Sequence, residues 1–116
     1  MSINTVCISG NLVRDAERRG NGPLAFTVAV NSRTKDASGE WTDKPNYIDC
    51  VLFGRLGEAI QERLKKGGKV CVQGELRQST WEKDGQKRSK TEVYVGNIEV
   101  STRAEKSEYP SDEVPF

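Results

Sequence analysis

Residues 46–76 read NYIDCVLFGRLGEAIQERLKKGGKVCVQGEL, and this stretch decides the fold. Its first part, residues 46–54, alternates between polar and apolar side chains, as a half-buried strand does. From Lys69 to Arg77, one residue past its end, the chain alternates in the same way and predicts a second strand. In the first of these strands we expect the core side to carry Ile48, Cys50 and Leu52.

Between these strands the apolar spacing changes to that of a helix. Side chains that recur at i, i+3, i+4, i+7 and i+8 form one amphipathic stripe: Leu56, Ala59, Ile60, Arg63 and Leu64. Gly67 and Gly68 follow and can end the helix in a left-handed conformation. No other segment predicts a helix this clearly.

Upstream, two more strands are predicted. Residues 4–13 are rich in β-branched side chains and contain Gly10, as a strand bent at a barrel corner does. A charged turn at 14–22 leads to residues 24–31, which alternate with one apolar face. Residues 32–45 are polar and predict a loop or a projecting hairpin.

Downstream, Asp84–Gly85 turns the chain back into a last strand at 93–100. One face of that strand stays apolar only if a bulge lies near Gly96–Asn97. The predicted fold is therefore all-β. It is an OB-fold, a five-stranded Greek-key barrel with one helix between strands 3 and 4, spanning residues 1–103.

The charge is divided between this barrel and a tail. Residues 1–103 hold 17 basic and 13 acidic side chains, whereas residues 104–116 hold one Lys and four acids. Pro110 and Pro115 discourage regular structure, so we expect 104–116 to be a disordered acidic tail. An inert solvated terminus and a functional tip are both open readings of such a segment.

Composition excludes several classes. No stretch approaches the ~20 apolar residues that span a bilayer, and no signal-like N-terminus is present, so we expect a soluble, cytoplasmic protein. Cys7, Cys50 and Cys71 have no CxxC spacing and lie in apolar runs, which favours buried free thiols. Because the chain has no His, we expect no metal site and no cofactor.

Two aromatic residues share one face of the third predicted strand. Tyr47 and Phe53 are six residues apart, or roughly 20 Å along a strand. They are too distant to pack on each other, but they can stack on bases several nucleotides apart. The alternative is that both are ordinary core or sheet-surface aromatics.

Tryptophan and cations occur together in the two polar hairpin segments. Trp81 lies in the basic segment 78–90, which favours a base-stacking platform beside phosphate-neutralising side chains over a Trp packed on its own hairpin. Trp41 lies in a weaker version of the same mixture. The candidate phosphate contacts are Arg33, Lys35, Arg55, Arg77, Lys83, Lys87, Arg88 and Lys90.

Catalysis is not expected. The usual acid–base residue is absent, and the chain has neither a nucleophile elbow nor a phosphate-cradling glycine loop. Asp36, Asp43 and Asp49 do not have the spacing of metal ligands.

The sequence resembles the bacterial single-stranded DNA-binding proteins from Ile3 to about Val100 and again at its end. The similarity lies in NTVCISGNLVRDAE, in FTVAVNSRTKD with GEW, in residues 46–76, in STWEKDGQKR and in SDEVPF. It implies base stacking on Tyr47, Phe53 and Trp81. A fourth aromatic common in the family falls near Thr34 and is absent here, with Trp41 as our candidate substitute.

The resemblance also implies partners. It implies a homotetramer, or less often a dimer, that binds single-stranded DNA in replication, recombination and repair. Many members have a His where this chain has Ile48, which bears on the contact between subunits. The acidic ending implies a tip that binds other replication and repair proteins, formed by Asp112, Glu113, Val114, Pro115 and Phe116.

Two other functions fit an OB barrel. One is a protein-interaction module with weak nucleic-acid binding, which the Tyr47, Phe53 and Trp81 set disfavours. The other is an RNA-binding barrel, since nothing in the sequence excludes a 2′-hydroxyl.

Overall fold

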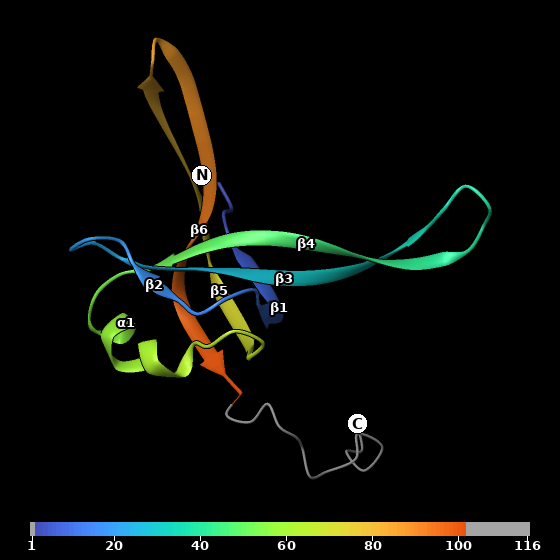
Figure 1. Ribbon diagram of the computed structural model, residues 1–116, viewed down its shortest axis with the longest axis horizontal. Coiled ribbons are helices and arrows are strands. Elements are labelled where there is room, and N and C mark those ends of the chain that lie inside the picture. Colours follow the sequence, from blue (N-terminus) through green and yellow to red (C-terminus); the bar gives the residue numbers. More distant parts are fainter. Residues whose placement is uncertain (1, 102–116) are drawn as a thin grey trace.

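The computed structural model describes residues 2–101, which form a closed β-barrel with two projecting hairpins and one short helix (Figure 1). The element bounds are β1 Val6–Leu12, β2 Glu17–Arg18, β3 Leu24–Lys35, β4 Trp41–Leu52, α1 Arg55–Ile60, a 3-10 turn Gln61–Arg63, β5 Lys69–Lys83 and β6 Gln86–Val100.

The sheet runs in the order β1-β5-β6-β4-β3-β2, and β1 also pairs with β3, which closes the barrel. The closing pairs are Asn11 with Ala29 and Leu12 with Val28. Gly10 stands just before this seam, where a Cβ would collide with the carbonyl oxygen of Ala29. Glycine is therefore required at position 10 because the backbone of β3 approaches it closely.

The predicted OB-type barrel of five long strands is confirmed, with one difference in the count. The charged segment 14–22 contains a two-residue strand, β2, which pairs with the start of β3. The helix consequently lies between β4 and β5 instead of between the third and fourth strands. The bulge is also confirmed: Gln73 pairs with Asn97 and Gly74 with Val95, which leaves Gly96 as the extra residue.

The core fills the barrel with side chains from every long strand and from the helical segment. Ile48 is partly buried and Cys50 and Leu52 are fully buried, as predicted. Val51 is also buried, although it points to the opposite face. The main cluster comprises Leu12, Ala16, Leu24, Phe26, Val28, Cys50, Leu52, Ile60, Leu64, Val70, Val72 and Val93.

Two expectations were wrong in detail. The buried side of the helical segment differs from the predicted stripe. Ile60 and Leu64 are buried as predicted, but Gly57 is the buried residue one turn before Ile60, and Leu56, Ala59 and Arg63 are exposed. Only Cys50 is a buried thiol: the strand alternation that turns Val70 and Val72 inward turns Cys71 outward, and Cys7 is likewise exposed on β1.

The polar segments 32–45 and 78–90 both form hairpins, which we call the β3–β4 arm and the β5–β6 arm (Figure 1). Asp84 and Gly85 both have positive φ, so the predicted turn of the β5–β6 arm is confirmed. At the tip of the β3–β4 arm the Asp36 carboxylate accepts hydrogen bonds from the Glu40 and Ser38 N–H groups. Within the described residues, no helix has the length and apolar character needed to cross a membrane.

Candidate nucleic-acid interface

Three aromatic side chains lie along β4 and the residue that follows it. Trp41 and Tyr47 are in β4 and Phe53 comes directly after its last residue; they are spaced six residues apart, so strand alternation gives them the same face. Their exposed fractions are 58%, 64% and 52%. Large aromatic rings that remain exposed along one face mark a surface that binds something flat and apolar.

Strand β6 extends this face with a residue that the sequence analysis missed. Tyr94 lies beside Val51 in the β4–β6 pairing. Its ring centroid is 5.3 Å from that of Phe53 at an interplanar angle of 44°, and the Arg77 guanidinium lies 4.8 Å from the Tyr94 centroid. Arg77, Tyr94 and Phe53 therefore form one stack, which we call the Tyr94 stack. A signal was available, because Val93 and Val95 are apolar and strand alternation places Tyr94 between them on the opposite face.

The β5–β6 arm continues from the Tyr94 stack. Trp81 stands opposite Arg88, Ser79 opposite Lys90, and Arg77 opposite Glu92. Directly opposed residues share a face, so Trp81, Arg88 and Lys90 lie on the side of Tyr94. The same alternation places Lys83 on this side and Lys87, which stands opposite Glu82, on the other.

The β3–β4 arm holds its tryptophan differently. Trp41 lies under two cations of the same arm, with Arg33 at 5.8 Å and Lys35 at 5.7 Å from the ring centroid. Arg33 also approaches Asp43 at 3.8 Å. The structure thus brings together the three residues that the sequence analysis had selected in this segment.

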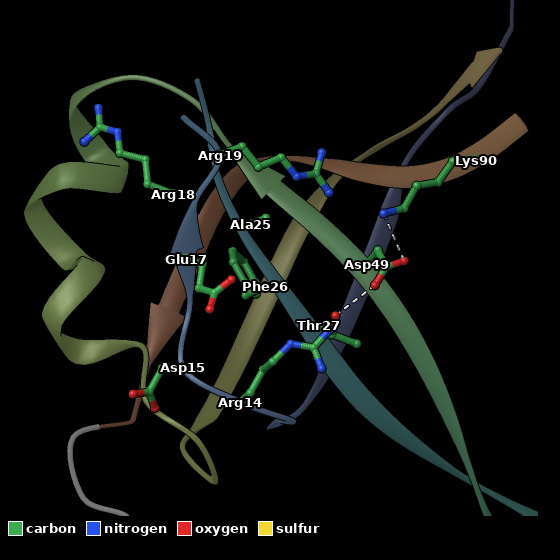
Figure 2. A pocket seen from close by; sticks show the side chains of 10 residues that line it. All are labelled: Arg14, Asp15, Glu17, Arg18, Arg19, Ala25, Phe26, Thr27, Asp49 and Lys90. Carbon is green, nitrogen blue, oxygen red and sulfur yellow. Dashed lines mark hydrogen bonds and ion pairs between the residues drawn. The ribbon is translucent and has the colours of Figure 1, made fainter. Parts of the chain in front are cut away.

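A charge network lies next to this face, and Figure 2 shows the part of it formed by Lys90, Asp49 and Thr27. Glu92 is only 6% exposed and binds Arg19 at 2.7 Å and Lys90 at 3.4 Å. Lys90 also approaches Asp49 at 3.6 Å, and Asp49 accepts a 2.8 Å hydrogen bond from the Thr27 hydroxyl. Arg19 was not predicted, because nothing local in the sequence indicates a partner 73 residues away.

The network also affects a neighbouring thiol. Burial raises the pKa of Cys50 to about 12, and the negative charges of Asp49 and Glu92 act in the same direction. Cys50 therefore stays a neutral core side chain at physiological pH. Within residues 2–101, no group of three or more His, Cys, Asp or Glu side chains is placed to hold a metal ion.

The eight side chains predicted to contact phosphates differ in whether a carboxylate of the protein already pairs with them. Arg33, Arg77 and Lys90 are ion-paired with carboxylates, and hydrogen bonding by Glu75 raises the pKa of Arg77. Within the described residues, the other five make no ion pair: Lys35, Arg55, Lys83, Lys87 and Arg88. The predicted tip, Asp112 to Phe116, lies outside the described residues.

Additional cations line a polar cavity of about 200 Å³ beneath the segment that contains β2 (Figure 2). Arg14, Arg18, Arg19 and Lys90 contribute positive charge, and Asp15, Glu17 and Asp49 offset part of it. None of the three arginines was selected from sequence, because the segment 14–22 was assigned only as a charged turn. Arginine side chains therefore also lie outside the two arms, in a cavity of mixed charge.

The sequence and the fold were compared with those of known proteins. The single-stranded DNA-binding protein of Treponema pallidum is 42% identical, with 97% of this chain and 69% of that protein aligned. A deletion mutant of the Thermus aquaticus single-stranded DNA binding protein superposes with a TM-score of 0.74 at 31% identity, covering 85% of this chain and 50% of that one.

A Plasmodium falciparum SSB solved in complex with ssDNA gives a TM-score of 0.73 over 87% of this chain and 96% of that chain. Its identity of 24% shows likeness of fold alone. Residues 3–101 match the Single-strand binding protein family along almost the whole described barrel. The chain therefore belongs to the single-strand binding protein family.

Proposed function

We propose that this chain binds single-stranded DNA without reading its sequence, as a protective coat during replication, recombination and repair. The observation that carries the proposal is the single face on which Trp41, Tyr47, Phe53 and Trp81 stay exposed beside cationic side chains. Membership of the family and the relatives' printed names support the same ligand.

The geometry suggests how binding avoids sequence preference. Each base has a π face, so stacking on an aromatic ring contributes about 1–3 kcal/mol per base regardless of base identity. Cations such as Arg88 and Lys83 neutralise phosphates and release counterions, which makes affinity depend on salt. Stacking thus acts on the bases and cationic charge acts on the phosphates, and every DNA strand has both. We propose no catalytic step.

The test is intrinsic tryptophan fluorescence during titration with poly-dT at low and high salt. We expect deep quenching that weakens as salt rises, because a bound base covers an exposed indole ring. A folded protein whose fluorescence does not change at low salt would overturn the proposal. Matched RNA titrations give the preference between nucleic acids, and we expect DNA to bind more tightly.

We further propose that copies of the chain associate as a homotetramer or dimer. Within the described residues, Val6 to Gly10 pair only with β5, Asn11 pairs with both β5 and β3, and Leu12 pairs with β3. The open edge from Val6 to Gly10 offers unpaired backbone groups to another copy. Light scattering across a concentration series measures the mass, and a monomer at every concentration would contradict association.

The division into a barrel at 1–103 and a tail at 104–116 remains a prediction, as does recruitment of replication and repair proteins. The support is the order of residue types, acids followed by an apolar Val-Pro-Phe ending. Deleting Phe116 is expected to abolish capture of such partners from a cytoplasmic extract while poly-dT still binds. Capture that is unchanged by the deletion would remove the tip from the proposal.

A further inference from the structure

A second cavity, of about 250 Å³, lies directly beside Phe53 and between the turn that precedes β3 and helix α1. Its floor is apolar, because Leu24 and Leu52 line it and are 4% and 2% exposed. Phe53 forms part of its wall. The cavity thus has an aromatic wall and an apolar base, which are the surfaces that a flat ring contacts.

Gly57 lets helix α1 approach this floor closely. It lines the cavity, and a Cβ added to it would lie 3.3 Å from the Leu52 carbonyl oxygen and 3.5 Å from the Leu24 Cβ, so a larger residue would crowd the floor. Within a helix, glycine is less favourable than alanine by about 1 kcal/mol. The small residue therefore permits this close packing at a cost to the helix.

The rim of the cavity is polar and partly charged. Asn21 and Gln61 contribute side-chain amides, which carry both donors and acceptors and can pair with the edge of any base. Arg18 and Glu58 form a 3.5 Å ion pair between side chains that are 44% and 61% exposed. Such an exposed pair is weak, so a phosphate can readily replace Glu58 as the partner of Arg18.

The cavity lies at one end of the aromatic face. The Tyr94 stack starts at Arg77 on the β5–β6 arm and ends at Phe53, and Phe53 also borders the cavity. Arg18 lines both this cavity and the cationic cavity of Figure 2. A strand that follows the stack past Phe53 therefore meets a ring-sized space and a cation together.

We propose that this cavity holds one nucleotide of the bound strand, with its base against Phe53 and its phosphate on Arg18. The inference rests on the proposed function and adds to it a discrete subsite beyond the end of the aromatic face. The ligand class is a single nucleobase with its 5′-phosphate.

The test is an NMR titration of the full chain with thymidine 5′-monophosphate and, separately, with a dT oligomer. We expect both ligands to shift the amides of Gly22 and Gly57, which line the cavity, and the oligomer to shift Trp81 as well. Oligomer shifts at Trp81 with none at Gly22 and Gly57 would overturn the subsite and leave DNA binding intact. No oligomer shift anywhere would instead overturn the proposed function.

Two variants separate the cavity from a general effect on folding. Gly57→Ala narrows the floor and Arg18→Gln removes the phosphate partner, so each is expected to weaken monophosphate binding about fivefold or more. Matched controls are Ala59→Leu on the exposed side of α1 and Lys65→Gln beyond the 3-10 turn, and neither should change binding. Wild-type affinity in both test variants would contradict the proposal, whatever their thermal stability.

Discussion

The two arms carry the same kinds of side chain but are supported in different ways. The β3–β4 arm presents Trp41 under its own Arg33 and Lys35, and residues 41–47 are all exposed. The β5–β6 arm presents Trp81. Where this arm meets the barrel, it contains the Tyr94 stack and the buried Glu92. The comparison teaches that the two tryptophans of one face differ in support: Trp41 is held by cations of its own arm, whereas the arm of Trp81 is also held by a buried carboxylate.

The largest expected effect comes from breaking the anchored region. Phe53→Ala removes a stacking ring, the packing partner of Tyr94 and the wall of the second cavity. One lost stacking contact costs about 1–3 kcal/mol, or roughly 5- to 150-fold in affinity. Titration with a dT oligomer measures the change. Leu56→Ala, at an exposed apolar residue of α1 three positions after Phe53, is the control and should change affinity less than about twofold.

The contribution of Glu92 to holding the β5–β6 arm is tested by the free energy of unfolding. Glu92→Gln leaves Arg19 and Lys90 without their buried carboxylate, and because both cations are partly exposed we expect a loss of about 1–2 kcal/mol in unfolding free energy. Urea denaturation measures it. The matched change in the other arm, Asp43→Asn, removes an exposed partner of Arg33 and should cost less than about 0.5 kcal/mol. Equal losses would contradict the difference between the arms.

Two neighbouring cations of the β5–β6 arm test which face of the arm the DNA strand follows. Arg88 shares the face of Trp81, whereas Lys87 is on the opposite face. Arg88→Ala should reduce the slope of log affinity against log salt by about 0.7, the value for one phosphate contact on a single strand. Lys87→Ala should leave the slope unchanged. A larger change for Lys87 than for Arg88 would show that the strand follows the other face.

The smallest effect is expected at the tip of the β3–β4 arm. The Glu40 N–H and the Ser38 hydroxyl lower the pKa of the exposed Asp36 carboxyl below its ordinary value of 3.8. Its stabilising contribution is therefore present above about pH 3.8 and is lost as pH falls through the lower pKa of the folded state. In Asp36→Asn, the part of the decrease in Tm between pH 5 and pH 2 that comes from this carboxyl should be absent, which is a difference of no more than about 1 °C from the wild type. DNA binding at pH 7 should be unchanged.

The sequence predicted those features that depend on local alternation. The strands, the Asp84–Gly85 turn and the bulge at Gly96 all follow from spacing within a few residues. Arg19 was missed because its partner Glu92 is 73 residues away. For Tyr94, alternation indicates its face, but its position beside Phe53 depends on the pairing of β4 with β6. The exposure of Cys71 was misjudged because an apolar run was given priority over the alternation that Val70 and Val72 set.

The central claim is that a bound strand lies over the anchored β5–β6 arm and the Tyr94 stack. The chain has two tryptophans, so Trp41→Phe leaves Trp81 as the sole reporter and Trp81→Phe leaves Trp41. Fluorescence of the two variants during titration with a dT oligomer tests the claim. We predict that Trp81 is quenched more deeply and at lower oligomer concentration than Trp41. Quenching of Trp41 alone, or of Trp41 at lower concentration than Trp81, would contradict it.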